Sequence, residues 1–432
     1  MKHFSKILPL LFFAALLANA QTYKAYVDKM ADQLEPKTIE WRRHLHQNPE
    51  LSNREFKTSE YVAEKLKALG IEVKTGIAKT GVVGILKGGK PGPCVALRAD
   101  MDALPVVERV PVAFASTAKS VYNGQEVGVM HACGHDTHVA MMLAAAEILS
   151  GMKKDIKGTV KFIFQPAEEG APRGEEGGAK LMIKEGMLEN PKVDAIFGIH
   201  INAQTEVGKI KYRPEGIMAS VDILRIKVKG RQSHGAYPWL GVDPIVVSSQ
   251  IILGLQTIVS RQLELTNNAA VITIGSLHGG VRNNIIPEEV NMEGTIRSLD
   301  AVMQRIIHER IKRTAEKIAE SAGATAEVEI SKEYPVTFNH QQLMEKMVPT
   351  LQKINGRENA TLTKAVTGAE DFSFFQEKVP GVFVFVGGMP KGKDVTETAA
   401  HHTPDFFIDE SGMKTGVKTY CMLALDYLEM KK

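Results

Sequence analysis

The sequence contains only 3 cysteines, an odd number that cannot form the disulfide framework of a small secreted protein. Acidic and basic residues almost balance, with 50 Asp and Glu against 53 Lys and Arg in 432 residues. No overall attraction to nucleic acid or to an anionic membrane is therefore expected. The charged share of 24% and the hydrophobic share of 44% are ordinary for globular proteins, which excludes collagen-like and disordered chains. We expect a soluble protein of two or three domains.

Several catalytic motifs are also absent. The chain has no G-x-S-x-G sequence, which weakens a serine hydrolase interpretation. It has no H-E-x-x-H and no paired C-x-x-C, which excludes the commonest zinc protease and structural zinc patterns. Gly84-x-x-x-x-Gly89-Lys90 begins like a phosphate-binding loop, but Pro91 replaces the Ser or Thr that should follow. We interpret that segment as a turn.

The first 20 residues have the features of a secretory signal peptide. A basic start precedes an apolar run from Ile7 to Leu17, and Ala18-Asn19-Ala20 supplies a small-residue cleavage site. The run is shorter than the roughly 20 residues that span a bilayer. We expect cleavage near Ala20-Gln21 and export to the periplasm or the medium, with no membrane attachment of the mature protein. A buried N-terminal helix is the alternative.

Residues 21–214 alternate between helical and strand patterns. Buried strands are predicted at the apolar runs 82–86, 94–97, 160–164 and 195–199. Pro49 ends a first helix, and Ser52-x-x-Glu55 predicts a capping box that opens the next one. The alternation resumes after residue 335. It predicts an α/β fold with helices on both faces of a mostly parallel sheet.

The pattern changes between residues 215 and 334, a segment bracketed by Pro214 and Pro335. Strands are expected at 221–228, 270–277, 290–297 and 326–330, and helices at 244–263 and 302–322. This β-α-β-β-α-β order is the split βαβ of ferredoxin-like domains. We therefore predict a discontinuous catalytic domain, residues 21–214 and 335–432, interrupted by an inserted α+β domain, residues 215–334.

The strongest chemical signal is the segment His131-Ala132-Cys133-Gly134-His135-Asp136-Thr137-His138. Its C-x-H spacing places two side chains on the same side of an extended loop, where both can reach one ion. Thiolate sulfur and neutral imidazole nitrogen are good ligands for zinc and similar ions. A lone surface His would be unremarkable, but three His, one Cys and one Asp in eight residues predict a metal site.

Further candidate ligands follow predicted strands. Glu168 and Glu169 follow the strand at 160–164, and His200 follows the strand at 195–199. Functional groups of α/β sheets gather beyond the carboxyl ends of strands. Adjacent carboxylates suit a division of labour in which one binds metal and the other transfers protons. Each alone could be a solvated acid pair or a structural His, but together they predict a single site.

Taken in order, these motifs resemble the dinuclear metallo-amidohydrolases, a family that includes aminoacylase, carboxypeptidase G, hippurate hydrolase and the plant auxin–amino-acid conjugate hydrolases. The resemblance is closest to the hippurate and auxin-conjugate hydrolase branch, and it covers essentially the whole mature chain. It is carried by Arg43-His44-x-His46-x-x-Pro49-Glu50, Leu97-Arg98-Ala99-Asp100-Met101-Asp102-Ala103-Leu104-Pro105, His131 to Asp136, Gln165 to Glu169, Gly198-Ile199-His200, Gly230-x-x-Ser233-His234, Asn284-Ile285-Ile286-Pro287, Gly294-Thr295-Ile296-Arg297, Gly368-x-Glu370-Asp371-Phe372 and His402-x-Pro404.

The resemblance implies two divalent ions per subunit, of Zn, Mn, Ni or Co. Their ligands would be Cys133, His135, Glu169, His200 and His402. Glu168 would act as general base and acid. His402 is preferred to His401 because the family's ligand directly precedes a Ser/Thr-Pro pair.

Asp100 and Asp102 stand near the position where the wider family often has a ligand His. The Cys133 and His135 pair would replace that arrangement, so the two aspartates are interpreted as groups that orient the ligands. Cys94 and Cys421 lie in apolar runs and are predicted to be core thiols.

In the inserted domain, the resemblance implies that His234 reaches the active site of a partner subunit and stabilises an oxyanion. Asn284 and Arg297 would hold the carboxylate of the substrate, a task that suits the bidentate geometry of arginine. The domain would act as a lid and as the interface of a homodimer. Alternatively, His234 is a surface histidine and Arg297 an ordinary charge at a strand end.

The implied activity is metal-dependent hydrolysis of the amide bond of a small N-acyl amino acid, hippurate-like or N-acetyl. The products would be a carboxylate and a free amino acid. A metallo-exopeptidase that acts on dipeptides or folate-like conjugates is the first alternative. A non-catalytic metal-binding dimer is the second.

Overall fold

The structure is a computed structural model that describes the backbone of residues 7–430 and the side chains of residues 23–430. The chain divides into two compact units. The first comprises Met1–Glu215, Asn339–Thr363 and Phe374–Lys432, and the second comprises Gly216–Phe338 and Lys364–Ser373. Residues 1–6 of the predicted signal peptide lie outside the described residues, and residues 7–20 form the first turns of helix α1 (Ile7–Gln47).

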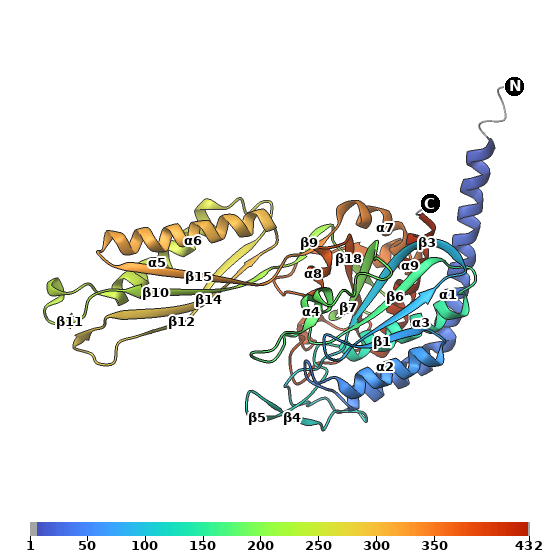
Figure 1. Cartoon of the computed structure of the whole chain (residues 1–432), viewed down its shortest axis with the longest axis horizontal. Helices are drawn as coiled ribbons and strands as arrows, with labels where there is room; N and C mark the ends of the chain where they lie inside the picture. The colour runs from blue at the N-terminus through green and yellow to red at the C-terminus, as the bar shows by residue number, and fades with distance from the viewer. Residues whose placement is uncertain (1–6, 431–432) are drawn as a thin grey trace. The chain divides into compact units, whose positions relative to one another are not determined.

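An eight-stranded sheet forms the centre of the first unit (Figure 1). In spatial order its strands are β1 (Glu72–Ile77), β2 (Gly81–Lys87), β6 (Lys157–Gln165), β3 (Lys90–Asp100), β7 (Ala195–Glu206), β18 (Gly381–Met389), β8 (Ile210–Tyr212) and β17 (Ala360–Leu362). The four central strands, β6, β3, β7 and β18, are parallel. The register places Leu97 between Phe162 and Phe197, all three fully buried. The predicted α/β fold with a mostly parallel sheet is confirmed.

Helices α3 and α9 pack against the central strands and against α1. The helices of this unit after α1 are α2 (Phe56–Ala68), α3 (His135–Gly151), α4 (Gly178–Lys184), α7 (Gln341–Asn355) and α9 (Met413–Met430), and the short α8 (Phe372–Gln376) spans the boundary of the units. Val139 to Ala146 of α3 are fully buried because this run of Ala, Met, Leu and Val is apolar on every side of the helix. Cys94 and Cys421 are buried free thiols in the same core, as predicted.

The second unit is built on a four-stranded antiparallel sheet of order β12-β14-β10-β15. Along the chain its main elements are β10 (Val221–Lys229), α5 (Pro244–Thr257), β12 (Ala270–Gly279), β14 (Glu289–Ser298), α6 (Ala301–Ser321) and β15 (Thr325–Tyr334). Both the predicted β-α-β-β-α-β order and the ferredoxin-like arrangement of the inserted segment are confirmed.

One face of this second sheet packs against α5 and α6. Side chains alternate along a strand, so Leu224 and Ile226 of β10 are buried in the core whereas Arg225 between them is exposed. Asp243 and Asp300 cap the two helices by accepting main-chain N–H bonds at their first turns. The opposite face of the sheet therefore presents charged and polar side chains to solvent.

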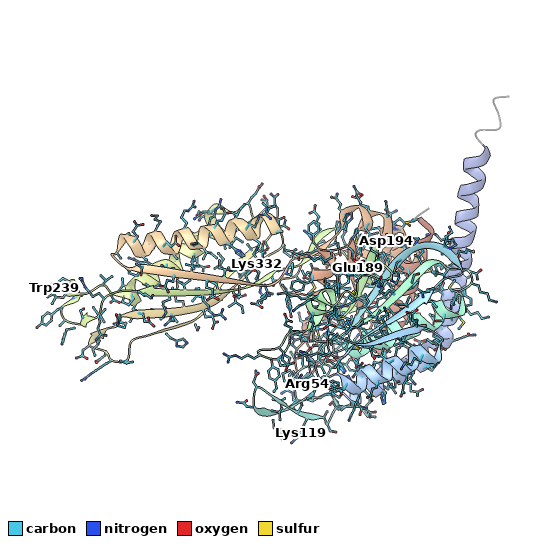
Figure 2. All side chains as sticks on the ribbon, in the orientation of Figure 1. Arg54, Lys119, Glu189, Asp194, Trp239 and Lys332 are labelled. Atoms are coloured by element: carbon cyan, nitrogen blue, oxygen red, sulfur yellow. The ribbon has the colours of Figure 1, made fainter. Side chains whose placement is uncertain are left out.

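Three small ribbons complete the secondary structure. Strands β4 (Lys119–Tyr122) and β5 (Gln125–Gly128) form a hairpin around Asn123 and Gly124, whose positive φ angles suit a tight hairpin turn; Figure 2 labels Lys119 on it. In the second unit β11 (Ser233–His234) pairs with β13 (Ile285–Ile286). Strands β9 (Glu215–Met218) and β16 (Thr337–Asn339) also pair with each other.

The capping box predicted at Ser52 and Glu55 does not form. Helix α2 begins at Phe56, and Glu50, not Ser52 or Glu55, accepts main-chain N–H groups of its first turn, those of Lys57 at 3.2 Å and Thr58 at 2.8 Å. Ser52 instead donates to Asp102 Oδ2 at 2.7 Å, and Glu55 accepts the main-chain N–H of Ala167 at 2.9 Å. That prediction was wrong because both side chains turn into the protein, toward buried groups distant in sequence.

Candidate metal centre

The predicted site residues of the first unit gather beyond the carboxyl ends of the adjacent strands β6, β3 and β7. Asp100 ends β3, Glu168 and Glu169 follow β6, and His200 belongs to β7. His200 does not end its strand as predicted, since β7 continues to Glu206. The arrangement follows the rule that ligands of open parallel sheets lie at strand carboxyl ends.

His135 is the first residue of α3, and its position depends on Gly134. Gly134 has φ +92°, and a Cβ there would lie 2.4 Å from Ile201 Cγ2, so only glycine fits. His135 Nδ1 donates to the carbonyl oxygen of Asp102 at 2.8 Å. Its Nε2 is buried and makes no hydrogen bond within the described part of the chain.

The free Nε2 of His135 faces carboxylates. It lies 3.8 Å from Asp100 Oδ2, 3.9 Å from Glu168 Oε2 and 3.9 Å from Glu169 Oε1. With Nδ1 donating, Nε2 carries the lone pair. A buried lone pair that faces carboxylate oxygens requires a proton or a metal ion between them.

Cys133 is the centre of the remaining predicted ligands. Its Sγ lies 3.3 Å from His402 Nε2 and 3.5 Å from His200 Nε2, and His402 Nε2 is 3.1 Å from Glu169 Oε1. All five residues therefore meet in two overlapping groups, Cys133 with His135 and His200, and Cys133 with Glu169 and His402. Within each group the ligand atoms lie within 4.8 Å of one another.

The two adjacent histidines near the C-terminus differ in their bonding. His401 Nδ1 donates to the carbonyl oxygen of Cys133 at 3.2 Å, and its Nε2 accepts the N–H of Ala203 at 3.1 Å. Both nitrogens of His401 are thus engaged by the main chain. His402 directs Nε2 toward Cys133 and Glu169, so the geometry favours His402, the predicted choice, as the ligand.

His138, the last histidine of the metal-site segment, is also engaged at both nitrogens. Its Nδ1 donates to Asp100 Oδ1, and its Nε2 accepts the N–H of Ile201 at 2.8 Å. Asp100 receives a second bond at Oδ2 from Arg98 Nη1, at 2.6 Å, with both side chains fully buried. His138 and Arg98 therefore hold Asp100 in place beside His135.

Asp102 holds the acidic turn that follows β6. Its Oδ1 accepts the N–H of Glu168 at 3.1 Å, and its Oδ2 accepts the N–H of Glu169 at 3.0 Å. Its carbonyl oxygen binds His135, as described above. One buried aspartate thus binds the main-chain N–H groups of two acids and the imidazole of His135.

The electrostatics of the centre favour a bound cation. Burial alone would lower the pKa of His135, but Asp100, Asp102 and Glu169 outweigh it and raise that pKa to about 10. Burial, together with Glu169 and Glu168, raises the pKa of the Cys133 thiol well above its usual value. A divalent ion would neutralise this excess of buried acid, so the residues present fit a metal site.

A second buried network lies behind Asp136, the neighbour of His135. Arg42 Nε donates to Asp136 Oδ2 at 2.7 Å, and His46 Nδ1 donates to the same oxygen at 2.8 Å. His46 Nε2 lies 3.1 Å from Glu108 Oε1. Sequence reasoning assigned no role to Arg42 or Glu108; the i, i+4 spacing of Arg42 and His46 on one helix face was the available signal.

The predicted residues of the second unit do not all meet within one chain. His234 pairs with Ile285, and the carbonyl oxygen of Asn284 accepts the N–H of Gly235 at 2.8 Å, so His234 and Asn284 are neighbours. Arg297 lies toward the opposite end of the sheet, because β14 pairs Ile296 with Asp222 at the start of β10. About seven residues of strand, roughly 23 Å, separate the two ends.

A set of thiol, imidazole and carboxylate ligands, mostly buried apart from the exposed His402, lies at the carboxyl ends of parallel strands with a further acid beside it, and this arrangement defines a metal-dependent hydrolase. Residues 96–426 match the model of peptidase family M20/M25/M40, and the chain belongs to this family. The predicted resemblance, the enzyme class and the binding of divalent metal are thereby confirmed.

Relatives of the chain include peptidases and deacetylases. The chain is 41% identical over 397 residues to thermostable carboxypeptidase 2 of Saccharolobus solfataricus, covering 91% of this chain and 96% of the relative. It is 36% identical over 405 residues to N-acetylcysteine deacetylase of Bacillus subtilis, with 93% and 100% covered. The crystal structure of the Bacillus subtilis YXEP protein, a dinuclear metal binding peptidase from the M20 family, matches with a TM-score of 0.78 at 34% identity, covering 92% and 99%.

Proposed function

We propose that the protein hydrolyses the amide bond of an N-acyl amino acid, releasing a carboxylate and a free amino acid. The observation that carries the proposal is the position of Glu168, a buried acid whose Oε2 lies 3.9 Å from the free Nε2 of His135. Glu169, next to it, belongs to the ligand set. This pair provides the division between proton transfer and metal binding that amide hydrolysis requires.

We propose two ions per subunit, of Zn, Mn, Ni or Co, because Cys133 belongs to two ligand groups at once. Such ions supply Lewis acidity, which polarises a carbonyl and lowers the pKa of water. Cys133, His135, Glu169, His200 and His402 would hold them. Asp100 and Asp102 keep these ligands oriented through the hydrogen bonds described above.

Glu168 transfers the proton of the reaction. Its carboxylate takes a proton from the attacking water while the water oxygen bonds to the carbonyl carbon of the amide. Glu168 then gives that proton to the nitrogen as the C–N bond breaks, so the acid returns to its starting state. Asp102 fixes the main chain of Glu168 and so limits the directions in which this carboxylate can point.

Arg297 is the proposed anchor for the carboxylate of the substrate. Its guanidinium is half-buried and forms no ion pair with any acid in the described part of the chain. Burial lowers the pKa of Arg297, an effect that Asp222 partly offsets. A desolvated, unpaired guanidinium can bind a carboxylate with two parallel hydrogen bonds.

We propose a homodimer in which His234 and Asn284 of each subunit serve the active site of the other. Within one chain these residues lie far along the sheet from Arg297, so a joint site with Arg297 requires a second copy. The turn beside His234 is apolar and exposed, with Trp239 72% exposed at the end of the unit (Figure 2). Exposed apolar surface of this kind is typical of an interface.

A pocket beside Glu169 supports a compact acyl group. It has a volume of about 170 Å³. Its apolar lining includes Leu51, Leu104, Pro105, Val121 and Tyr122. A benzoyl or acetyl group fits such a volume, which favours hippurate-like and N-acetyl substrates.

We also propose export of the protein after cleavage near Ala20-Gln21, on the basis of the N-terminal sequence.

The test combines a substrate panel with one variant. Purified protein loaded with Mn or Zn is assayed side by side on hippurate, N-acetyl amino acids and dipeptides. Faster hydrolysis of dipeptides would favour the exopeptidase alternative, which the likeness to a carboxypeptidase also supports. Glu168→Gln should retain metal by elemental analysis and lose at least about 1,000-fold in kcat. Wild-type kcat in that variant would contradict the mechanism.

A further inference from the structure

The acidic turn after β6 is held by a second buried carboxylate besides Asp102. Three consecutive main-chain N–H groups, those of Ala167, Glu168 and Glu169, donate to buried carboxylates. The latter two bind Asp102, whereas Ala167 binds Glu55 Oε1 at 2.9 Å. Glu55 belongs to the segment before α2, 112 residues earlier in the chain.

Ala167 needs this support because its backbone is strained. Its φ of +51° places it in the left-handed region, which a residue with a Cβ rarely adopts. Ala167 is buried and directly precedes Glu168, so its backbone conformation sets the direction of the Glu168 backbone. Strained residues persist only where their surroundings over-determine them, and Glu55 is one such restraint.

The side chain of Glu55 is itself held in place by a second hydrogen bond. Its side chain is fully buried, and its Oε2 accepts the hydroxyl of Thr80 at 2.7 Å. It does not cap α2. Burial, with the nearby charge of Asp102, raises the pKa of Glu55 to about 8, so a buried acid is retained here at a cost.

We propose that Glu55 is a positioning residue for the reaction: by binding the N–H of Ala167, it holds the strained turn that aims Glu168. The proposal rests on the proposed role of Glu168 as base and acid. Glu55 does not exchange protons with substrate, so its shape and its acceptor oxygen should matter more than its charge.

The kinetic test uses two substitutions at Glu55 and one at Ala167. Glu55→Ala removes the acceptor and should lower kcat by about 10-fold to 100-fold, with KM within about threefold and metal content unchanged. Glu55→Gln keeps an acceptor for Ala167 and can donate to Thr80, so it should stay within about fivefold of wild type. If Gln is as damaging as Ala, the charge acts directly and the positioning role is wrong.

Ala167→Gly supplies the decisive combination. Glycine adopts positive φ without strain, so the turn needs less restraint. Ala167→Gly alone should stay within about threefold of wild-type kcat, and added to Glu55→Ala it should restore kcat by at least about fivefold. Simple multiplication of the two losses would show that Glu55 does not act through Ala167.

A readout independent of catalysis separates this proposal from the proposed function. Hydrogen exchange of the metal-loaded protein without substrate should be faster at residues 165–170 in Glu55→Ala than in wild type. Asp426→Asn is the matched control, because Asp426 Oδ2 accepts the Thr350 hydroxyl at 2.6 Å between α9 and α7; it should leave that exchange unchanged. Unchanged exchange in Glu55→Ala would overturn the proposal even if Glu168→Gln is inactive.

Should Glu55→Ala fail to fold, Thr80→Val tests the same link. It removes only the hydroxyl that fixes Glu55 Oε2, and it should speed exchange at residues 165–170 and lower kcat by about threefold. Wild-type exchange and kcat in Thr80→Val would overturn the proposal as well. Conversely, fast exchange in these variants together with a fully active Glu168→Gln variant would support the restraint of the turn by Glu55 and would contradict only the proposed role of Glu168.

Discussion

Charged side chains are used differently in the two units. In the first unit, Arg98 and Asp100 form an ion pair with both side chains fully buried, beside the metal ligands. On the open sheet face of the second unit, Arg225 of β10 reaches Glu293 of β14 and Glu329 of β15, and all three side chains are 45% to 69% exposed. A buried charge left unpaired is costly, whereas an exposed pair contributes little.

The difference shows that side chains beside the metal ligands are constrained by chemistry, whereas those on the open sheet face are constrained by solubility. Each buried acid or imidazole around Cys133 is held in one orientation, because its hydrogen bonds within the protein must replace those that it made to water. The exposed pairs can be exchanged for water at little cost. Perturbing each region should therefore give effects that differ by a large factor, and the following predictions test this from the largest effect to the smallest.

Metal removal should have the largest effect. Dialysis against a chelator should lower hydrolysis at least about 1,000-fold and lower the melting temperature, because Asp100, Glu168 and Glu169 then face His135 without a cation. At a free metal concentration 1,000 times the Kd, metal binding would stabilise the fold by about 4 kcal/mol. Readdition of Mn or Zn should restore both properties. Full activity in protein shown to be metal-free would contradict the metal centre.

Among substitutions outside the ligand set, Arg42→Met should lower the free energy of unfolding the most. Arg42 is 3% exposed, and its removal takes the guanidinium away from the buried carboxylate of Asp136, which keeps the hydrogen bond from His46. Breaking a buried pair from one side costs about 3–5 kcal/mol, measurable by urea unfolding. Arg43→Met is the control, since Arg43 is 49% exposed and should cost at most about 1 kcal/mol. Equal losses of unfolding free energy in the two variants would contradict the expected difference between buried and exposed ion pairs.

The loss of stability caused by His46→Gln should depend on pH, because His46 belongs to the same network. Burial lowers the pKa of His46, but Asp136 and Glu108 outweigh burial and raise that pKa above its usual value. A raised pKa stabilises the fold fully below about pH 6.5, and the gain disappears as pH rises through the pKa of the folded protein. The variant should therefore lose about 1–2 kcal/mol more at pH 6 than at pH 9. The same loss at both pH values would mean that His46 stays neutral.

Much of the centre could be predicted from local sequence. Cys133 and His135 are two residues apart, and Glu168 and Glu169 follow an apolar strand, so spacing and strand ends suffice to group them. The order of elements in the second unit followed equally from its side-chain periodicity. In each case the signal lies within one element or one turn.

The remaining interactions depend on partners distant in sequence. Ser52 and Glu55 fit a capping box locally, but Asp102 and Ala167, on other elements, bind them instead. Asn284 and Arg297 are predicted to hold one carboxylate, and strand register places Arg297 near one end of the four-stranded sheet and Asn284 beyond its other end. Register and long-range hydrogen bonds are properties of the assembled fold, so no local pattern contains them.

Arg225→Met should give the smallest effect and set the lower limit of the comparison. Its two partners stay hydrated, so the free energy of unfolding should fall by at most about 0.5 kcal/mol, with kcat unchanged. The same substitution also reports on association. If the loss exceeds about 2 kcal/mol and grows with protein concentration, a second copy must cover this face. The ion pairs of Arg225 would then be buried, like those of the first unit. A small loss that is independent of concentration leaves the apolar turn around Trp239 as the candidate contact of the proposed dimer.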